Sequence, residues 1–370
     1  MTTLADIFHQ HGAEYLQRYS AVMPPHQKKA IRDILSCRTP HLGGHTWFCE
    51  NCQEFHYNYH SCKNRSCPQC QNEQAEDWLN HQSDNLLPVE YFLATFTIPE
   101  HLKPIFRKHP KTGYHVLFQS AAKSLKKLAL DKRFIGGKIG MIGVLHTWSR
   151  QLTLHPHIHF IIPGIALSEQ NQKITFSKNG FLMRIEPLSM IFKAKFRDAV
   201  MKAGLKHLVP EHVWRQDWVV HIKSVSNGQA ALTYLAPYLY RIAISNSNIL
   251  ACHNNHVAFR FKDSNSGRFK TMTLPALEFL RRFLQHVLPK GFQKIRYFGF
   301  LHPKNKTLMN TLRLLLHCNI YSNKTNGAQH FVFKCPCCGK EMILIDKTIR
   351  QRAPPLAVLL PEYRKVSILC

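Results

Sequence analysis

Acidic residues are scarce in this sequence, and long apolar runs are missing. Its 370 residues include 22 Asp and Glu against 49 Lys and Arg, which gives a formal net charge of +27 at pH 7. No apolar run approaches the ~18 residues that a membrane-spanning helix requires. The first residues, MTTLADIFHQHGAEYLQ, contain no basic segment followed by an apolar one. We therefore expect neither a membrane protein nor a secreted one.

Glycine and proline are not in excess either, and no repeat or low-complexity tract interrupts the chain. With 17 Gly, 20 Pro and 45% apolar residues, the composition is that of a globular protein rather than a disordered one. The length suggests two or three domains. The excess of positive charge predicts a polyanionic partner, nucleic acid first. A generally basic proteome and a membrane surface are the alternative explanations of that charge.

Hydrophobic periodicity predicts an α+β fold built on antiparallel strands. The run HPHIHFIIPGI follows the run KIGMIGVLHTW after the connection SRQLTL, which is too short for a helix, so the two should pair as an antiparallel hairpin. Further strands are expected at 89–99, 218–225, 256–263 and 268–274, and helices within 1–48, 71–87, 101–132, 229–245 and 274–288. The expected domains are a helical and zinc-binding domain over 1–87, the sheet domain over 88–250, and an α/β region over 251–370.

Two C-x2-C pairs, separated by fourteen residues, predict a structural zinc site. Four thiolates satisfy tetrahedral zinc and leave no open position for catalysis. The ligands would be Cys49, Cys52, Cys67 and Cys70. Cys62, His56 and His60 lie between the pairs and could replace a ligand or bind a second ion. Clustered C-x2-C pairs favour metal binding over disulfides, so we expect a reducing, cytoplasmic compartment.

Two basic residues and a second cysteine cluster accompany this motif. Lys63 and Arg65 lie between the C-x2-C pairs, where we expect them to contact phosphates. Near the C-terminus, FKCPCCGKEM offers Cys335 and Cys338, which are half of a zinc site. The upstream pair His317 and Cys318 is the candidate for completing a second zinc knuckle. The alternative is a strained turn with unpaired thiols.

Alternating histidines indicate a second kind of metal site. In a strand, His155, His157 and His159 would share one face. If the hairpin turns near the middle of 149–154, His146 lies opposite His157, close enough to complete a three-histidine site. Three imidazoles leave coordination positions open, as a catalytic ion requires. His155 would then lie at the start of the strand as a supporting or DNA-contacting group.

Two tyrosines one helical turn apart supply a candidate nucleophile. Tyr234 and Tyr238 would share a helix face, and a phenol can attack a phosphodiester when a metal polarises the phosphate. Pro237 between them would end or kink that helix. Arg241, among aromatic residues, could contact single-stranded DNA. The alternative is an amphipathic helix whose tyrosines only pack.

These motifs together resemble the rolling-circle insertion-sequence transposases of the HUH superfamily that carry an N-terminal zinc-binding domain. The likeness rests on SCKNRSCPQCQ at 61–71, GVLHTW…LHPHIHFIIPG at 143–164 and YLAPYLYRIAIS at 234–245, in the family's order. It implies a nuclease with an antiparallel sheet flanked by helices. It also implies that His157 and His159 hold the catalytic ion and that Tyr234 or Tyr238 forms a 5′-phosphotyrosine link.

The resemblance also sets the expected cofactors and partners. It implies single-stranded DNA or hairpin element ends as substrate, and host replication proteins are candidate partners. For phosphate chemistry we favour Mg²⁺ or Mn²⁺ at the histidines, beside the structural Zn²⁺. A relaxase or replication initiator is a close alternative, although no G-x-x-x-x-G-K-[ST] motif of a helicase is present. An inactive zinc-dependent nucleic-acid-binding protein is the alternative without catalysis. A third alternative is a zinc hydrolase that uses the histidine cluster on small substrates. Such an enzyme would not require the net charge of +27 or Tyr234.

Overall fold

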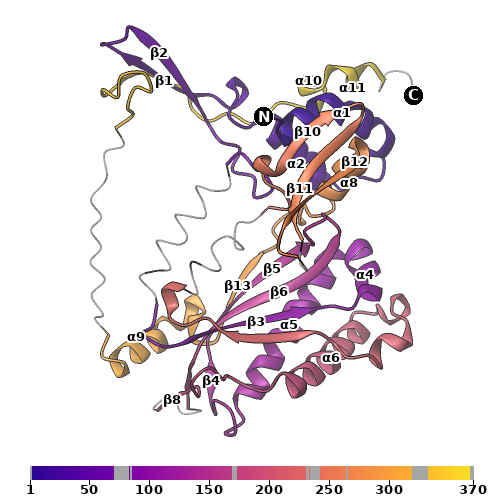
Figure 1. Ribbon diagram of the computed structural model, residues 1–370, viewed down its shortest axis with the longest axis vertical. Coiled ribbons are helices and arrows are strands. Elements are labelled where there is room, and N and C mark those ends of the chain that lie inside the picture. The colour runs from indigo at the N-terminus through magenta and orange to yellow at the C-terminus, as the bar shows by residue number, and fades with distance from the viewer. Residues whose placement is uncertain are drawn as a thin grey trace.

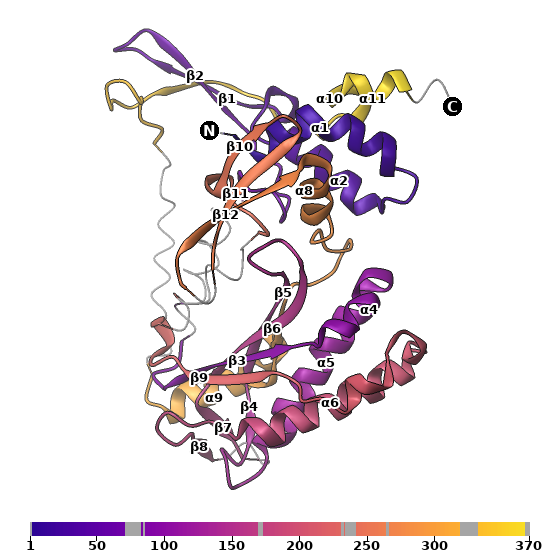
Figure 2. The same ribbon diagram turned by 45° about the vertical axis from the view of Figure 1, so that its right-hand side comes forward.

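The fold has a sheet-and-helix body, a mainly helical lobe beside it, and a long β-hairpin that projects from that lobe (Figures 1 and 2). The computed structural model describes residues 2–70, 83, 86–168, 173–230, 233, 242–263, 266–318 and 332–366. Most of the helix expected over 71–87 lies outside these residues. No helix within these ranges is long and apolar enough to cross a bilayer.

A five-stranded antiparallel sheet forms the body. Its strand order is β13-β5-β6-β3-β9, so β6 is central. The strands are β3 (Tyr91–Thr97), β5 (Met141–Trp148), β6 (Leu154–Pro163), β9 (Val220–Ser224) and β13 (Ile295–Phe298). The antiparallel hairpin expected from the sequence is confirmed, with His146 opposite His157. The expected α+β fold is therefore present.

Helices cover one face of this sheet. They are α4 (Lys103–Lys108), α5 (Pro110–Ala129) and α6 (Ile185–Lys202). Phe160 of β6 and Phe96 of β3 join Phe192 and Phe196 of α6 in the largest apolar core. Alternate residues of β6 point into this core, and the histidines between them point to the opposite face. Burial of Pro156, Ile158 and Phe160 thus fixes the register that presents the histidines.

Smaller elements extend the body at one end of the sheet. The strands β4 (Lys138–Ile139), β7 (Ile165–Leu167) and β8 (Ile174–Phe176) form a second antiparallel sheet. Helix α9 (Lys306–Leu315) packs beside them through Leu312, which is fully buried against Phe300.

The helical lobe combines segments from both ends of the chain. Its elements are α1 (Leu4–Tyr19), α2 (Pro25–Leu35), β10 (Ile249–His253), β11 (His256–Lys262), β12 (Phe269–Pro275), α8 (Ala276–Leu284), α10 (Leu356–Leu359) and α11 (Pro361–Val366). A capping box at Thr3 and Asp6 starts α1. The apolar stripe of α1 packs on α8, where the Phe8 and Phe283 rings are 6.1 Å apart.

The described elements are therefore interleaved rather than arranged as three consecutive domains. Strand β13 comes from the expected region 251–370 but completes the sheet of 88–250. Helix α8 and β10–β12 share one core with α1 and α2. The physical reason is that α1 and α2 have to bury their apolar faces, and the elements that cover those faces lie more than 200 residues later in the chain. Boundaries at 87 and 250 do not separate these units.

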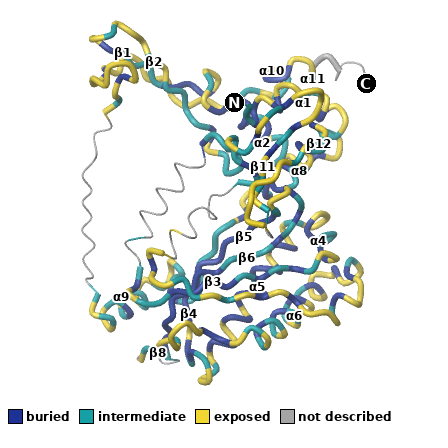
Figure 3. Tube along the Cα trace, viewed as in Figure 1, coloured by how far each residue is buried: buried dark blue, intermediate teal, exposed yellow. Residues whose placement is uncertain are grey.

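A three-stranded sheet projects from the helical lobe, and we call it the finger. It consists of β1 (Gly44–Cys49), β2 (Glu54–Tyr59) and β14 (Ile343–Lys347), with β1 in the middle. Both pairings are antiparallel, and His45 lies opposite Lys347. The finger is much more exposed than the body (Figure 3).

The helix that the sequence predicts over 229–245 is present at its start but does not extend to residue 245. It begins at Gly228, where the Asn227 side chain accepts a hydrogen bond from the Ala230 amide. Residues 242–245 are not helical. Tyr234, Tyr238 and Arg241 lie outside the described residues.

Candidate metal centres and nucleic-acid interface

Three histidines meet on the sheet face opposite the helices. His146 of β5 lies opposite His157 of the central strand, and His159 follows two residues later on the same face. The His146 ring centroid is 5.2 Å from that of His157 and 4.9 Å from that of His159. One ring nitrogen from each lies within 4.8 Å of the others. The geometry expected from strand alternation and hairpin register is therefore present.

Hydrogen bonds orient two of these rings for metal binding. The Nδ1 atom of His157 donates to the backbone carbonyl of His155 at 2.7 Å, which makes Nε2 the nitrogen available to a cation. The Thr95 hydroxyl, from the register position opposite His159, contacts Nδ1 of that ring at 2.9 Å. Such supporting contacts fix the tautomer and the ring orientation of metal ligands.

Burial also favours the neutral form of two of these histidines. Burial lowers the pKa of His157 to about 3, and burial together with nearby Lys223 lowers the pKa of His159 to about 4. A neutral imidazole is the form that binds metal. Three converging imidazole nitrogens therefore fit a divalent cation and leave positions open for water or a phosphate oxygen. His155 is half-buried and outside this set, with its ring 5.1 Å from that of His157.

Aromatic and basic residues adjoin the histidines. The Trp148 ring stacks on His146 at 5.1 Å, and the Lys294 ammonium lies 5.1 Å from the Trp148 centroid. Burial, together with the nearby positive charge of Arg65, lowers the pKa of Lys294 to about 7. Arg65, Trp148 and Lys294 line a small cavity of about 30 Å³, together with Ile242 and Ala243. Thus the chain just beyond Arg241 returns close to the histidines.

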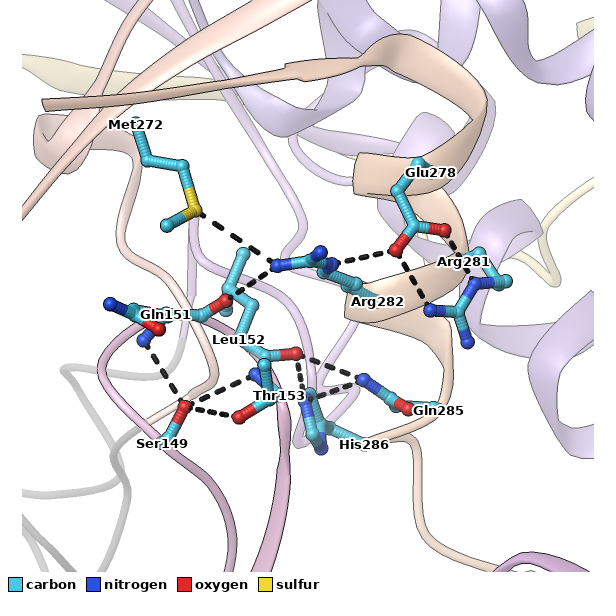
Figure 4. Close-up of polar contacts among 10 residues, drawn as sticks. All are labelled: Ser149, Gln151, Leu152, Thr153, Met272, Glu278, Arg281, Arg282, Gln285 and His286. Atoms are coloured by element: carbon cyan, nitrogen blue, oxygen red, sulfur yellow. Dashed lines mark hydrogen bonds and ion pairs between the residues drawn. The ribbon is translucent and has the colours of Figure 1, made fainter.

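The turn between the two histidine strands is held by the helical lobe (Figure 4). Gln285 donates to the Leu152 carbonyl at 2.9 Å, and buried His286 contacts the same oxygen at 3.1 Å. Arg282 donates to the Gln151 carbonyl at 3.3 Å. The Leu152 side chain is 1% exposed and belongs to the core of the lobe. Helix α8 therefore contacts the tip of the hairpin that carries the histidines.

The cysteines are grouped differently from the sequence prediction. Cys49 and Cys52 do not share a cluster with Cys67 and Cys70; the two pairs belong to separate four-cysteine groups. The cause is the β1–β2 hairpin, since a six-residue strand spans ~20 Å and carries the first pair to the finger's tip. The chain then returns, and the second pair lies at the finger's base.

The first cysteine group lies at the base of the finger. It consists of Cys37, Cys62, Cys67 and Cys70, all buried. The Cys62 amide donates to the Cys37 sulfur at 3.4 Å, and the Cys62 and Cys70 sulfurs are 3.7 Å apart. Four converging thiols without an open position are suited to structural zinc. Cys37 was missed in the sequence because it stands alone after α2.

The second cysteine group lies at the tip. Cys335 and Cys338 converge with Cys49 and Cys52. His317 and Cys318, which were expected to complete this site because they are near in sequence, are not part of the group. The Cys318 sulfur instead contacts the Leu316 carbonyl after α9, at 3.8 Å. The antiparallel pairing of β14 with β1 brings the distant cysteines together.

The two basic residues of the motif have different roles. Arg65 donates to the backbone carbonyls of Leu288, Pro289 and Phe292, which engages its guanidinium in internal contacts. The expected phosphate contact by Arg65 is therefore wrong for this structure; its guanidinium ties the finger's base to the segment after α8. Lys63 is exposed, as a phosphate contact would require.

A basic and aromatic cleft of about 460 Å³ runs along one face of the finger. Its lining includes Arg38, Trp47, Tyr59, His60 and Lys347. The rings of Tyr57 and Tyr59 are stacked at 6.2 Å with an interplanar angle of 11°. Cations beside flat rings are typical of surfaces that bind single-stranded nucleic acid. No local sequence pattern predicts this cleft, because the distant strand β14 supplies part of its wall.

An α+β body of the HUH type, joined to a cysteine-rich N-terminal region, defines a class of DNA-processing proteins. Comparison with known proteins agrees: a family model described as "Putative transposase" matches residues 140–307, and one described as "Transposase zinc-binding domain" matches residues 7–98. The chain belongs to the family of rolling-circle insertion-sequence transposases with an N-terminal zinc-binding domain. Membership implies binding to DNA and an enzyme that cleaves it and transfers strands.

Two relatives support this assignment. The "Putative transposase y4qJ" of Sinorhizobium fredii (strain NBRC 101917 / NGR234) is 35% identical over 318 residues, which are 80% of each chain. The "Transposase for insertion sequence element IS801" of Pseudomonas savastanoi pv. phaseolicola is 30% identical over 290 residues, which are 74% of this chain and 70% of the relative. No solved structure matches the chain.

Proposed function

We propose that this transposase nicks and rejoins single-stranded DNA through a covalent phosphotyrosine, with His146, His157 and His159 holding Mg²⁺ or Mn²⁺. The observation that carries the proposal is the cluster of three imidazoles on β5 and β6, with one ring nitrogen of each within 4.8 Å of the others. Burial also lowers the pKa of His157 and of His159, which favours the neutral, metal-binding form of both rings. A divalent ion bound there would polarise the scissile phosphate and stabilise the departing oxygen. Zinc would serve a structural role in the N-terminal region.

The nucleophile in this proposal is the phenol of Tyr234 or Tyr238. The phenol loses its proton, its oxygen forms a bond to phosphorus, and the bond from phosphorus to the 3′-oxygen breaks. The 3′-oxygen takes a proton, and the 5′-phosphate stays on the protein. Reversal by another 3′-hydroxyl rejoins the strand. Support comes from Ile242 and Ala243, which line the cavity shared with Trp148 beside His146.

The covalent link can be tested with an end-labelled oligonucleotide. Protein is incubated with Mn²⁺ and single-stranded DNA from an element end, then resolved on a denaturing gel. A 3′ label should move to the protein band and a 5′ label should not. Replacing both Tyr234 and Tyr238 by Phe should abolish the adduct, whereas Tyr240→Phe, the matched neighbour, should keep it. Intact binding without any adduct would instead support a non-catalytic DNA-binding protein.

For DNA contact, we propose that the cleft on the finger binds single-stranded DNA. Tyr59 and Trp47 offer ring faces, while Arg38 and Lys347 supply positive charge. Base stacking on an aromatic side chain contributes ~1–3 kcal/mol per base. Exposed Lys63 lies in the same N-terminal region and would add a phosphate contact. Single-stranded DNA should therefore bind more tightly than duplex, which competition between the two forms measures.

A further inference from the structure

The tip of the finger brings together four thiols, two of which lie outside both matched family regions. We propose that Cys49, Cys52, Cys335 and Cys338 form a second structural zinc site, which fastens the late strand β14 to the N-terminal hairpin. Cys335 and Cys338 lie beyond both matched ranges, 7–98 and 140–307. This site is separate from the one at Cys37, and the proposal is independent of the nicking chemistry.

Sulfur positions at the tip fit one tetrahedral ion. The Cys49 and Cys338 sulfurs are 3.6 Å apart, the Cys335 and Cys52 sulfurs are 3.9 Å apart, and all four lie within 4.8 Å of one another. Zinc–sulfur bonds of ~2.3 Å in a tetrahedron place sulfurs ~3.8 Å apart. A disulfide would require ~2.05 Å, and all four cysteines are free. The spacing therefore favours a shared cation over a covalent bridge.

Both cysteine pairs have the same local backbone. The Gln53 amide donates to the Cys49 carbonyl, and the Gly339 amide donates to the Cys335 carbonyl, each at 2.8 Å. In each case the residue after the second cysteine has a left-handed backbone, with φ of 57° at Gln53 and 73° at Gly339. A left-handed conformation is unfavourable for glutamine, so something must stabilise that turn. Two matching turns that face each other are what a four-thiolate site requires.

The tip has too little apolar contact to hold itself together. Among the described residues, its buried cluster consists of Cys49, Cys335 and Met342, with Trp47, Cys52 and Phe333 packed against them. Three strands with so small a core need an additional source of stability, such as a bound metal ion. The neighbouring charge is favourable, because Lys340 hydrogen-bonds to Asn51 beside the site and can offset the negative charge of four thiolates.

This site would also shape the cleft on the finger. Leu344 and Lys347 of β14 line the cleft together with Trp47 and Tyr59 of the hairpin. An ion at the tip holds β14 against β1, so its loss should open one wall of the cleft. The DNA-binding consequence rests on the proposed function of the cleft, whereas the zinc content does not.

Zinc counting on full-length protein tests the proposal. We use His157→Ala as the background, so that no metal is counted at the histidines, and measure zinc by plasma mass spectrometry after gel filtration. The parent should hold two zinc ions per chain. Replacing both Cys335 and Cys338 by Ser should reduce this to one, and replacing both Cys49 and Cys52 should do the same. One zinc in the parent, or two in either double variant, would overturn the site.

Matched variants exclude a folding artefact and a different ligand set. Cys337→Ser alters the neighbouring thiol and should keep two zinc ions. His56→Ala should also keep two, although His56 Nε2 lies 4.0 Å from the Cys335 sulfur. Cys338→His preserves a metal-binding side chain and should retain two as well. Loss of one zinc in the His56 or Cys337 variant would contradict the four-cysteine set and assign the ion to His56, Cys335 and Cys337 instead.

Discussion

Thr95 is a small residue whose contact with His159 affects the whole proposed catalytic centre. Its hydroxyl lies 2.9 Å from Nδ1, on the strand next to the central one. A supporting partner of this kind holds the imidazole in one tautomer and one orientation. The sequence does not mark Thr95, because its importance depends on the pairing of β3 with β6.

We expect Thr95→Val to weaken Mn²⁺ binding by about 10- to 100-fold, since supporting partners of metal ligands contribute on that scale. Valine preserves the shape but removes the hydroxyl. Calorimetric titration with Mn²⁺ measures the change. Thr95→Ser keeps the hydroxyl and serves as the matched variant, which should bind as the parent does. Unchanged affinity in the valine variant would show that this contact does not orient the ring.

His286 makes the stability of the protein dependent on pH. Burial lowers its pKa to about 4, so the folded protein keeps the ring neutral while the unfolded chain protonates near pH 6.5. Stability is therefore complete above pH 6.5 and is lost as the pH falls toward 4, by at most about 1.4 kcal/mol per pH unit from this residue. Urea unfolding at pH 7 and pH 5 should show a smaller difference for His286→Gln than for the parent.

Among the elements, the hairpin β5–β6 joins the two halves of the molecule. Its turn inserts Leu152 into the core of the helical lobe, and its strands carry the histidines. Leu152 has a φ of 60°, an unfavourable conformation for a leucine. Burial of the side chain holds it there, together with the contacts that Gln285 and His286, just after α8, make with the Leu152 carbonyl (Figure 4).

Leu152→Ala should lower the free energy of unfolding by about 2–5 kcal/mol, because the substitution leaves a cavity in a packed core. Thermal unfolding without added metal measures the effect. Gln151→Ala changes an exposed neighbour whose carbonyl contact with Arg282 is unaffected, so its melting temperature should match that of the parent. Similar melting temperatures for both variants would mean that the turn is not an anchor.

Local patterns predicted the elements near the histidines well. Alternation in LHPHIHF and a short connection placed His146 opposite His157, since both signals act over a few residues. The cysteine grouping could not be found this way, because Cys338 meets Cys49 across 289 positions of sequence. Lys294 was missed for the same reason, as it lies next to β13. Neither Tyr234 nor Tyr238 is within the described residues, so the proposed nucleophiles remain predictions.

Across the whole molecule, the net charge of +27 should govern DNA binding. Each neutralised phosphate of a single strand changes the slope of log K against log salt by about 0.7. Lys347→Ala in the cleft should therefore make the slope shallower by about this amount. Lys202→Ala, an exposed lysine at the end of α6, should leave it unchanged. Fluorescence anisotropy with a labelled single strand at several salt concentrations measures both, and equal slopes would place DNA elsewhere.

The pairing of β14 with β1 has a consequence for how the protein is made. A chain still on the ribosome and shorter than about 330 residues contains β1 and β2 but none of the cysteines or the strand that complete them. Likewise, α10, which packs on α2, and α11, which packs on α1, both follow β14 in the chain. Shorter products therefore lack one wall of the cleft for which we propose DNA binding. Synthesis of β14 and of Cys335 and Cys338 has to precede completion of the finger.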